Sequence, residues 1–118
     1  MHWAHSYIGQ AWTPERTCWW LVREVLRMHA QVFLPAVPQW QSLRRASRAY
    51  SMRRVLEGMP REWDICIMRT PFNLHAGIVV VANGRIGVLH STAQTGVVWE
   101  SWLEAIEGSK VELWRRRP

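Results

Sequence analysis

The feature that most constrains the fold is the stretch 75–90, HAGIVVVANGRIGVLH, in which two apolar, β-branched runs flank an Asn-Gly pair. Asn83 and Gly84 both tolerate the positive φ angles that a two-residue turn requires, so the stretch is predicted to form a β-hairpin. With this turn, Ala82 pairs with Arg85, and counting outward sets the register of every other pair. The hairpin therefore decides which side chains share a face.

Two histidines are brought together by this register. His90 lies opposite Gly77, and His75 lies one diagonal step away on the same face, because side chains alternate with period two. Gly77 has no side chain and leaves room between the two imidazoles. A three-residue turn would move His90 to the other face, so the histidine pair depends on the predicted turn.

A helix is predicted to start at Thr13-Pro14-Glu15, which supplies a capping hydroxyl, a proline at the first helical position and an acid near the positive end of the dipole. It should run to about His29, with an apolar stripe on one side. Cys18 falls in the second turn on that stripe, so it is expected to face the core. A thiol near a helix N-terminus is in the setting that lowers a thiol pKa.

The remaining segments predict a sheet and two further helices. Pro35 and Pro38 make a connecting loop of residues 33–40. A second helix is expected from Ser42 to Gly58, with an apolar stripe and a separate face of arginines (Arg44, Arg45, Arg48, Arg53 and Arg54), which is either a solvated face or a docking surface for an acidic partner.

Further strands are expected at residues 64–69, 96–99 and 110–114. A capping box formed by Ser101 and Glu104 predicts a short helix that ends at Gly108. Helices followed by consecutive strands indicate an α+β fold: an N-terminal helix that bears the cysteine, packed on an antiparallel sheet of about five strands that bears the histidines. We expect a single domain, 1–118.

The amino-acid composition limits which partners, thiol states and cellular locations are expected for this chain. The net charge of +6 favours anionic partners without choosing among them. The nine tryptophans are scattered over the chain, so most are expected in the core or half-buried, and some facing a partner. Cys18 and Cys66 are expected to be free thiols, with Cys66 in the core. No apolar run is long enough for a membrane span, and the first residues do not resemble a signal peptide, so we expect synthesis in the cytoplasm.

A cysteine at the start of a helix, followed by a strand-borne histidine and a second polar residue on the next strand, is the order of a papain-like nucleophile, base and orienting residue. The chain resembles the NlpC family of papain-like cell-wall cysteine peptidases, and within it the compact phage tail-associated members. The similar segments, in order, are Tyr7-Ile-Gly-Gln-Ala-Trp12, Cys18-Trp-Trp-Leu-Val-Arg23, Trp63-Asp-Ile, His75-Ala-Gly-Ile, Leu89-His90-Ser91 and Val111-Glu-Leu-Trp-Arg115.

This resemblance implies a catalytic Cys18, with His75 as its general base within hydrogen-bonding reach and His90 orienting His75; Ser91 competes with His90 if the hairpin register slips. It implies substrate-binding roles for Trp12, Thr17 and Trp19, and no metal or other cofactor. The chain departs from the family at Thr17, where the family usually has Asp, and at Trp19 and Trp20, where it has small residues. Both tryptophans are expected to crowd the substrate cleft.

The function implied is a tail-tip cysteine peptidase that hydrolyses peptide bonds in peptidoglycan stem peptides during cell-wall penetration. The alternative is a structural tail-tip assembly protein that retains the fold, with the arginine face and exposed tryptophans as its contacts. The nearest enzymatic alternative is the CHAP type of amidase and peptidase. The expected partners are peptidoglycan and other tail-tip proteins of a phage virion made in the host cytoplasm; nucleic-acid binding is supported only by charge.

Overall fold

The hairpin is present with the predicted turn and register. Strands β3 (Leu74–Ala82) and β4 (Arg85–Thr92) are antiparallel, and Asn83 and Gly84 between them have φ angles of 51° and 74°. Ala82 pairs with Arg85 and Gly77 with His90, as counting from the turn requires. The two positive φ angles are those of a type I′ turn, whose twist matches that of the flanking strands.

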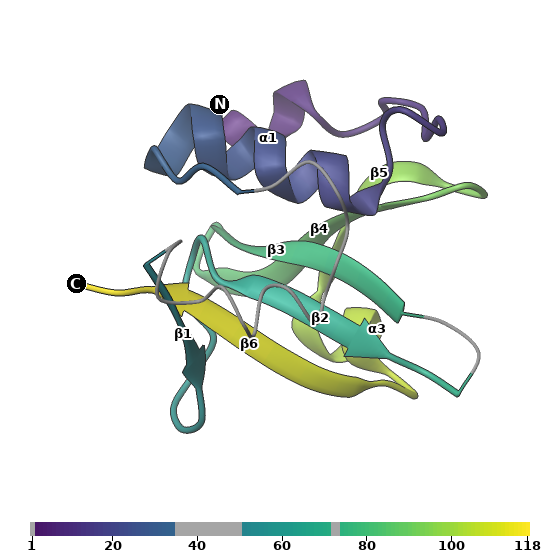
Figure 1. The fold of residues 1–118 in the computed structure, drawn as a ribbon. Helices are drawn as coiled ribbons and strands as arrows, with labels where there is room; N and C mark the ends of the chain where they lie inside the picture. The colour runs from purple at the N-terminus through teal and green to yellow at the C-terminus, as the bar shows by residue number, and fades with distance from the viewer. Residues whose placement is uncertain (1, 35–50, 72–73) are drawn as a thin grey trace.

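The computed structural model describes residues 2–34, 51–71 and 74–118 and contains a six-stranded antiparallel sheet in the order β1-β6-β2-β3-β4-β5 (Figure 1). The hairpin is flanked by β2 (Ile65–Arg69) and β5 (Gly96–Ser101), and β6 (Lys110–Arg116) lies between β2 and β1. The predicted α+β class is confirmed, with one strand more than expected.

The additional strand replaces part of the expected second helix. Residues Met52–Val55 form β1, which pairs with β6, so the helix predicted from Ser42 to Gly58 is wrong in its described part. Pairing along β6 buries Met52, whereas Leu56 of the supposed apolar stripe is 80% exposed. The earlier part of that prediction, including Arg44, Arg45 and Arg48, lies outside the described residues.

Helix α1 (Cys18–Ala30) begins later than predicted. Its N-cap is Thr17, whose side chain accepts a hydrogen bond from the backbone N–H of Trp20. The hydroxyl of Thr13 instead accepts from the backbone N–H of Arg16 and closes a separate turn. Cys18 is therefore the first residue of the helix, with its backbone among the unpaired N–H groups of the N-terminus.

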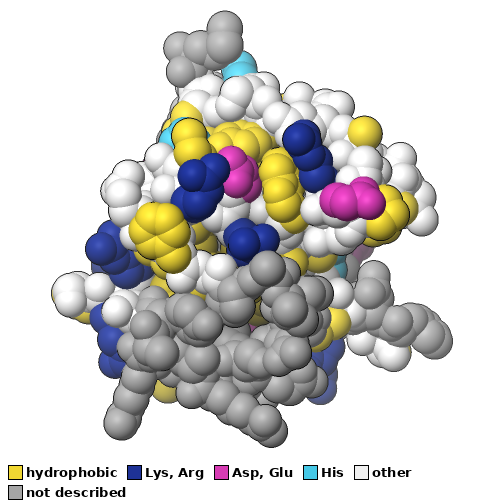
Figure 2. Space-filling model, turned by 45° about the horizontal axis from the view of Figure 1, so that its top comes forward, with side chains coloured by type: hydrophobic (Ala, Val, Ile, Leu, Met, Phe, Trp, Pro, Cys, Tyr) yellow, Lys and Arg dark blue, Asp and Glu magenta, His cyan; other side chains and the backbone are white. Residues whose placement is uncertain are grey.

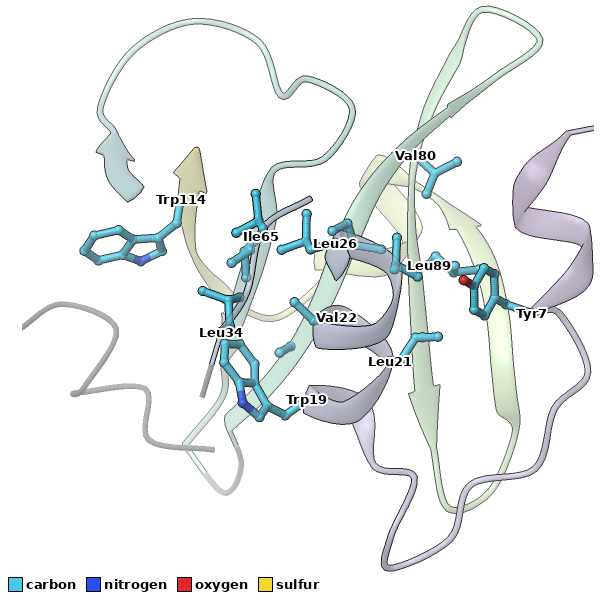
Figure 3. Packing of buried hydrophobic residues seen from close by; sticks show 14 of the residues in the cluster. Tyr7, Trp19, Leu21, Val22, Leu26, Leu34, Ile65, Val80, Leu89 and Trp114 are labelled. Atoms are coloured by element: carbon cyan, nitrogen blue, oxygen red, sulfur yellow. The ribbon is translucent and has the colours of Figure 1, made fainter. Parts of the chain in front are cut away.

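The sheet separates two layers of packing. Helix α1 lies on one face of β3 and β4 (Figure 1), and its apolar side packs into the main core with strand residues such as Ile65 and Leu89 (Figure 3). The short helix α3 (Trp102–Ile106) covers the other face, over a smaller cluster that contains Val79 and Val88. Alternation along β3 and β4 explains this division, since successive side chains point to opposite faces.

Several smaller predictions can be compared with the structure. Both cysteines are free, and Cys66 is fully buried, as expected. The capping box is wrong, because the Ser101 side chain makes no capping hydrogen bond, although Ser101 does precede α3. The described tryptophans are buried or half-buried, as expected for most of them, and contacts of tryptophans with a partner stay a prediction.

Candidate functional site

Cys18 lies at the N-terminus of α1, half-buried against the main core. Burial raises the pKa of its thiol above the ordinary value, while hydrogen bonds with the backbone of Ala76 and of the first helical residues act in the opposite direction. The expectation of a lowered thiol pKa is therefore wrong, because the pKa-raising effect of burial is larger than the pKa-lowering effect of the helix N-terminus. Nucleophilic chemistry at Cys18 needs a base to take its proton.

The two strand histidines contact each other as the hairpin register predicts. His75 Nε2 and His90 Nδ1 are 2.8 Å apart, and the rings meet edge to face at 5.0 Å between centroids. Gly77 makes this possible, since a Cβ there would lie 2.4 Å from Val88 Cγ1 and 3.1 Å from His90 Cβ. Burial, and then the neighbouring His90, lower the pKa of His75 from 6.5 to about 4, so His75 is neutral and able to accept a proton at neutral pH.

Glu100 is a site residue that sequence reasoning missed. Its Oε1 lies 2.7 Å from His90 Nε2, which extends the histidine pair by a carboxylate. The third strand was expected to end at Trp99, but β5 continues to Ser101. His90 pairs with Val98, and Glu100 is two residues further along β5, so it lies on the same face as His90. Extending the predicted strand 96–99 by one residue, with the same alternation of side chains, would have identified Glu100.

Cys18 and His75 line one cavity of about 540 Å³, together with Trp12 and Thr17. Trp12 and Thr17 thus line the same cavity as the thiol, and their substrate-binding role stays a prediction. The corresponding expectation for Trp19 is wrong, because its side chain is only 2% exposed and packs in the main core (Figure 3). Trp20 lies under the Arg16 guanidinium, at 4.9 Å, rather than in this lining. Neither tryptophan closes the cavity.

The thiol and the imidazole reach this cavity from different faces of the sheet. Cys18 packs with α1 against Ala76 and the main core, whereas alternation along β3 places His75 on the face of Val79. The expectation that both side chains face one core is therefore wrong. The cavity nonetheless joins them, because its lining includes Thr17 from the α1 side and Ala105 from the α3 side, around the start of β3.

Direct contact between the two groups stays a prediction. Among the described residues, no hydrogen bond joins the Cys18 thiol to His75, whose Nε2 faces His90. The nitrogen of His75 that remains for a proton from Cys18 is Nδ1. Proton transfer therefore requires Nδ1 and Sγ to approach across the cavity, as catalytic pairs often do only when substrate is bound.

Ser91, the competing third residue, does not take part in this chain of contacts. It is 1% exposed and alternates to the face opposite His90, and its buried hydroxyl has no hydrogen-bond partner among the described residues. In the same described part of the chain, no group of three or more His, Cys, Asp or Glu side chains is arranged to hold a metal ion. None of the helices described there is long and apolar enough to cross a membrane.

Comparisons with known proteins identify no family for this chain. No family model matches the sequence, and no curated protein is significantly similar to it. Among solved structures, the chain is similar to an N-acetylmuramoyl-L-alanine amidase from Bacteroides uniformis, with 12% identity and a TM-score of 0.43. The match covers 83% of this chain and 52% of the amidase chain, so the present chain spans about half the length of that protein. At this similarity, the match carries no conclusion about activity.

Proposed function

We propose that this protein is a cysteine hydrolase that cleaves peptide bonds in peptidoglycan stem peptides. The observation that carries the proposal is the Cys18 and His75 pair in one cavity, with His75 held by His90. A thiol, a neutral imidazole and a second group that orients the imidazole are the parts of a papain-like site. The choice of peptidoglycan as substrate rests on the sequence resemblance to the NlpC family.

The chemistry follows from the protonation states. His75 takes the proton of the Cys18 thiol, and the thiolate attacks the peptide carbonyl carbon to form a tetrahedral intermediate. Its collapse breaks the C–N bond, and the His75 imidazolium gives its proton to the departing amine. Water, with His75 again as base, then attacks the thioester, which releases the carboxylic acid and restores the thiol. The lowered pKa leaves His75 neutral in the resting protein, as a base must be before it takes a proton, and also makes it a weaker base than a free imidazole.

The cavity lining suits a neutral peptide segment. Its described side chains include the indole of Trp12 and the hydroxyls of Thr17, Thr70 and Thr92, with the amide of Gln94, and none of them is an Asp, Glu, Lys or Arg. Thr17, in place of the family's usual Asp, supplies a hydroxyl beside the thiol. We therefore expect substrates to be bound through amide and hydroxyl hydrogen bonds rather than through ion pairs.

Cleavage of purified peptidoglycan tests the proposal. Cys18→Ala should abolish release of stem-peptide fragments while lowering stability by only about 1 kcal/mol, because it replaces a thiol by a hydrogen at a half-buried site. His75→Ala should be nearly as damaging to the rate, and His90→Ala should be milder. The matched control is Cys66→Ala, the same change at a buried thiol outside the site, which should leave cleavage intact.

Alkylation distinguishes a working cysteine hydrolase from a protein that keeps the fold without activity. Iodoacetamide should label Cys18 rapidly at neutral pH and leave Cys66 unmodified, since burial raises the pKa of Cys66 to about 12. A wild-type protein that cleaves no peptidoglycan and whose Cys18 resists alkylation would contradict the proposal.

A structural part of a phage tail tip is the second candidate function. The raised pKa of Cys18 and the missing thiol–imidazole hydrogen bond among the described residues favour it, because both describe a resting, unactivated thiol. Such a protein would reside in the virion and bind other tail-tip proteins. On the face that carries α1, basic side chains are interspersed with acidic and hydrophobic ones (Figure 2), which fits a protein partner better than the backbone of a nucleic acid.

A further inference from the structure

A continuous line of hydrogen-bonding groups runs from the cavity across β4 to Glu100 on β5. His75 Nε2 is 2.8 Å from His90 Nδ1, and His90 Nε2 is 2.7 Å from Glu100 Oε1. The His90 side chain is 9% exposed and that of Glu100 is 38% exposed. Both nitrogens of a buried imidazole are thus engaged, one by a neutral base and one by a carboxylate near solvent.

The carboxylate determines where the protons lie. A glutamate ionised at neutral pH only accepts hydrogen bonds, so His90 must donate through Nε2. When His90 is neutral, an imidazole that donates through Nε2 accepts through Nδ1, so His75 then donates to His90 through its own Nε2. The lone pair of His75 is then on Nδ1, the nitrogen that remains for Cys18. The opposite tautomer of His75 would present an N–H to the thiol and could not take its proton.

We infer that Glu100 is a positioning residue that selects the tautomers of His90 and His75 and so makes His75 Nδ1 the base for Cys18. The inference rests on the proposed cysteine chemistry for its role, although the tautomers themselves do not depend on it. Glu100 also faces the positive charge that His75 acquires, one imidazole away, and stabilises the thiolate–imidazolium pair.

The charged groups around this line are few in the described structure. On this face, β3 and β4 carry His75 and His90 themselves, β5 carries Glu100, and β2 carries the buried thiol of Cys66. Helix α3, which covers this face, contributes Glu104, which is exposed, and among the described residues no hydrogen bond or ion pair joins it to either histidine. Glu104 therefore provides a matched control, since its removal changes the net charge equally without touching the line.

The first experiment observes the tautomers by ¹⁵N NMR of the histidine rings. In the wild type at neutral pH, His75 and His90 should each give the signature of a proton on Nε2. Glu100→Ala should convert these signals to a mixture of tautomers, Glu100→Asp should partly restore them, and Glu104→Ala should leave them unchanged. A wild-type His75 with its proton on Nδ1, or signals unaffected by Glu100→Ala, would overturn the inference.

The second experiment measures alkylation of Cys18 by iodoacetamide against pH. Glu100→Ala should lower the rate about tenfold at neutral pH, equivalent to about 1.4 kcal/mol, and should match the wild type at strongly alkaline pH, where the thiol ionises without a base. A structural defect would lower the rate at every pH. A wild-type Cys18 that is unreactive at neutral pH would contradict the proposed function, while the NMR experiment would still decide the role of Glu100.

Discussion

The close approach of β3 and β4 at Gly77 is the residue-scale feature on which the histidine pair depends. A Cβ at this position would lie 2.4 Å from Val88 Cγ1 and 3.0 Å from the backbone oxygen of Leu89. Gly77→Ala must therefore push the two strands apart next to His90, and overpacking of this kind typically costs about 1–3 kcal/mol. We expect a lower melting temperature together with slower alkylation of Cys18.

Gly84→Ala is the control for that substitution. Gly84 has a φ of 74°, but a Cβ added there would meet no atom within 4 Å, so the alanine strains only the turn. It should cost on the order of 1 kcal/mol and leave Cys18 reactivity unchanged. Equal losses of reactivity in the two variants would show that the histidine contact does not depend on Gly77.

Trp63 illustrates how a single residue can hold an unfavourable backbone conformation. Its φ is 76°, in the region that glycine adopts most easily. The indole stacks on Trp3 at 4.8 Å and lies parallel to His29 at 5.8 Å. Ring packing of this size offsets a backbone cost of about 1–3 kcal/mol.

At the scale of elements, the position of α1 decides the environment of the thiol. Thr17 rather than Thr13 caps the helix, so Cys18 is at its first position. Thr17→Ala should lower the free energy of unfolding by about 1 kcal/mol, because the N–H of Trp20 loses its acceptor. Thermal or urea denaturation measures the effect.

Two further variants sharpen this prediction. Thr17→Asp should retain stability within a few tenths of a kcal/mol, since Asp is an equally good N-cap. Thr13→Ala, which removes a hydroxyl from an exposed turn before the helix, should cost less than Thr17→Ala. If Thr13→Ala proves the more destabilising, the helix begins at Thr13 in solution.

At the scale of the whole molecule, the buried histidine makes stability depend on pH. The pKa of His75 is lowered from 6.5 to about 4 on folding. Between these values the unfolded chain binds a proton that the folded protein does not, so stability falls as the pH is lowered from about 6.5 to about 4 and levels off below. Each pKa unit corresponds to about 1.4 kcal/mol, so the loss is on the order of 3 kcal/mol.

Melting curves at several pH values between neutral and 4 test this dependence. His75→Gln should remove much of the acid sensitivity, since glutamine does not titrate. His5→Gln, at an exposed histidine, should behave like the wild type. An unchanged pH dependence in His75→Gln would mean that other groups cause the acid loss.

The sequence by itself determined what local rules decide. The Asn-Gly turn sets the register of β3 and β4, and period-two alternation then places His75 beside His90 across Gly77. An apolar stripe sufficed to predict the helix that carries Cys18, although not its first residue, because two neighbouring threonines are both able to cap.

Only the tertiary structure decided what depends on partners distant in the chain. Met52–Val55 is a strand because β6 pairs with it, and this pairing outweighs a helical pattern in the sequence. Trp19 is buried because residues of other elements cover it. The cavity forms because the N-terminus of α1 and the first residues of β3 both line it, although they are far apart in the sequence. Glu100 joins His90 only when β4 and β5 lie side by side, and a carboxylate near a strand end has no assigned partner until the strands pair.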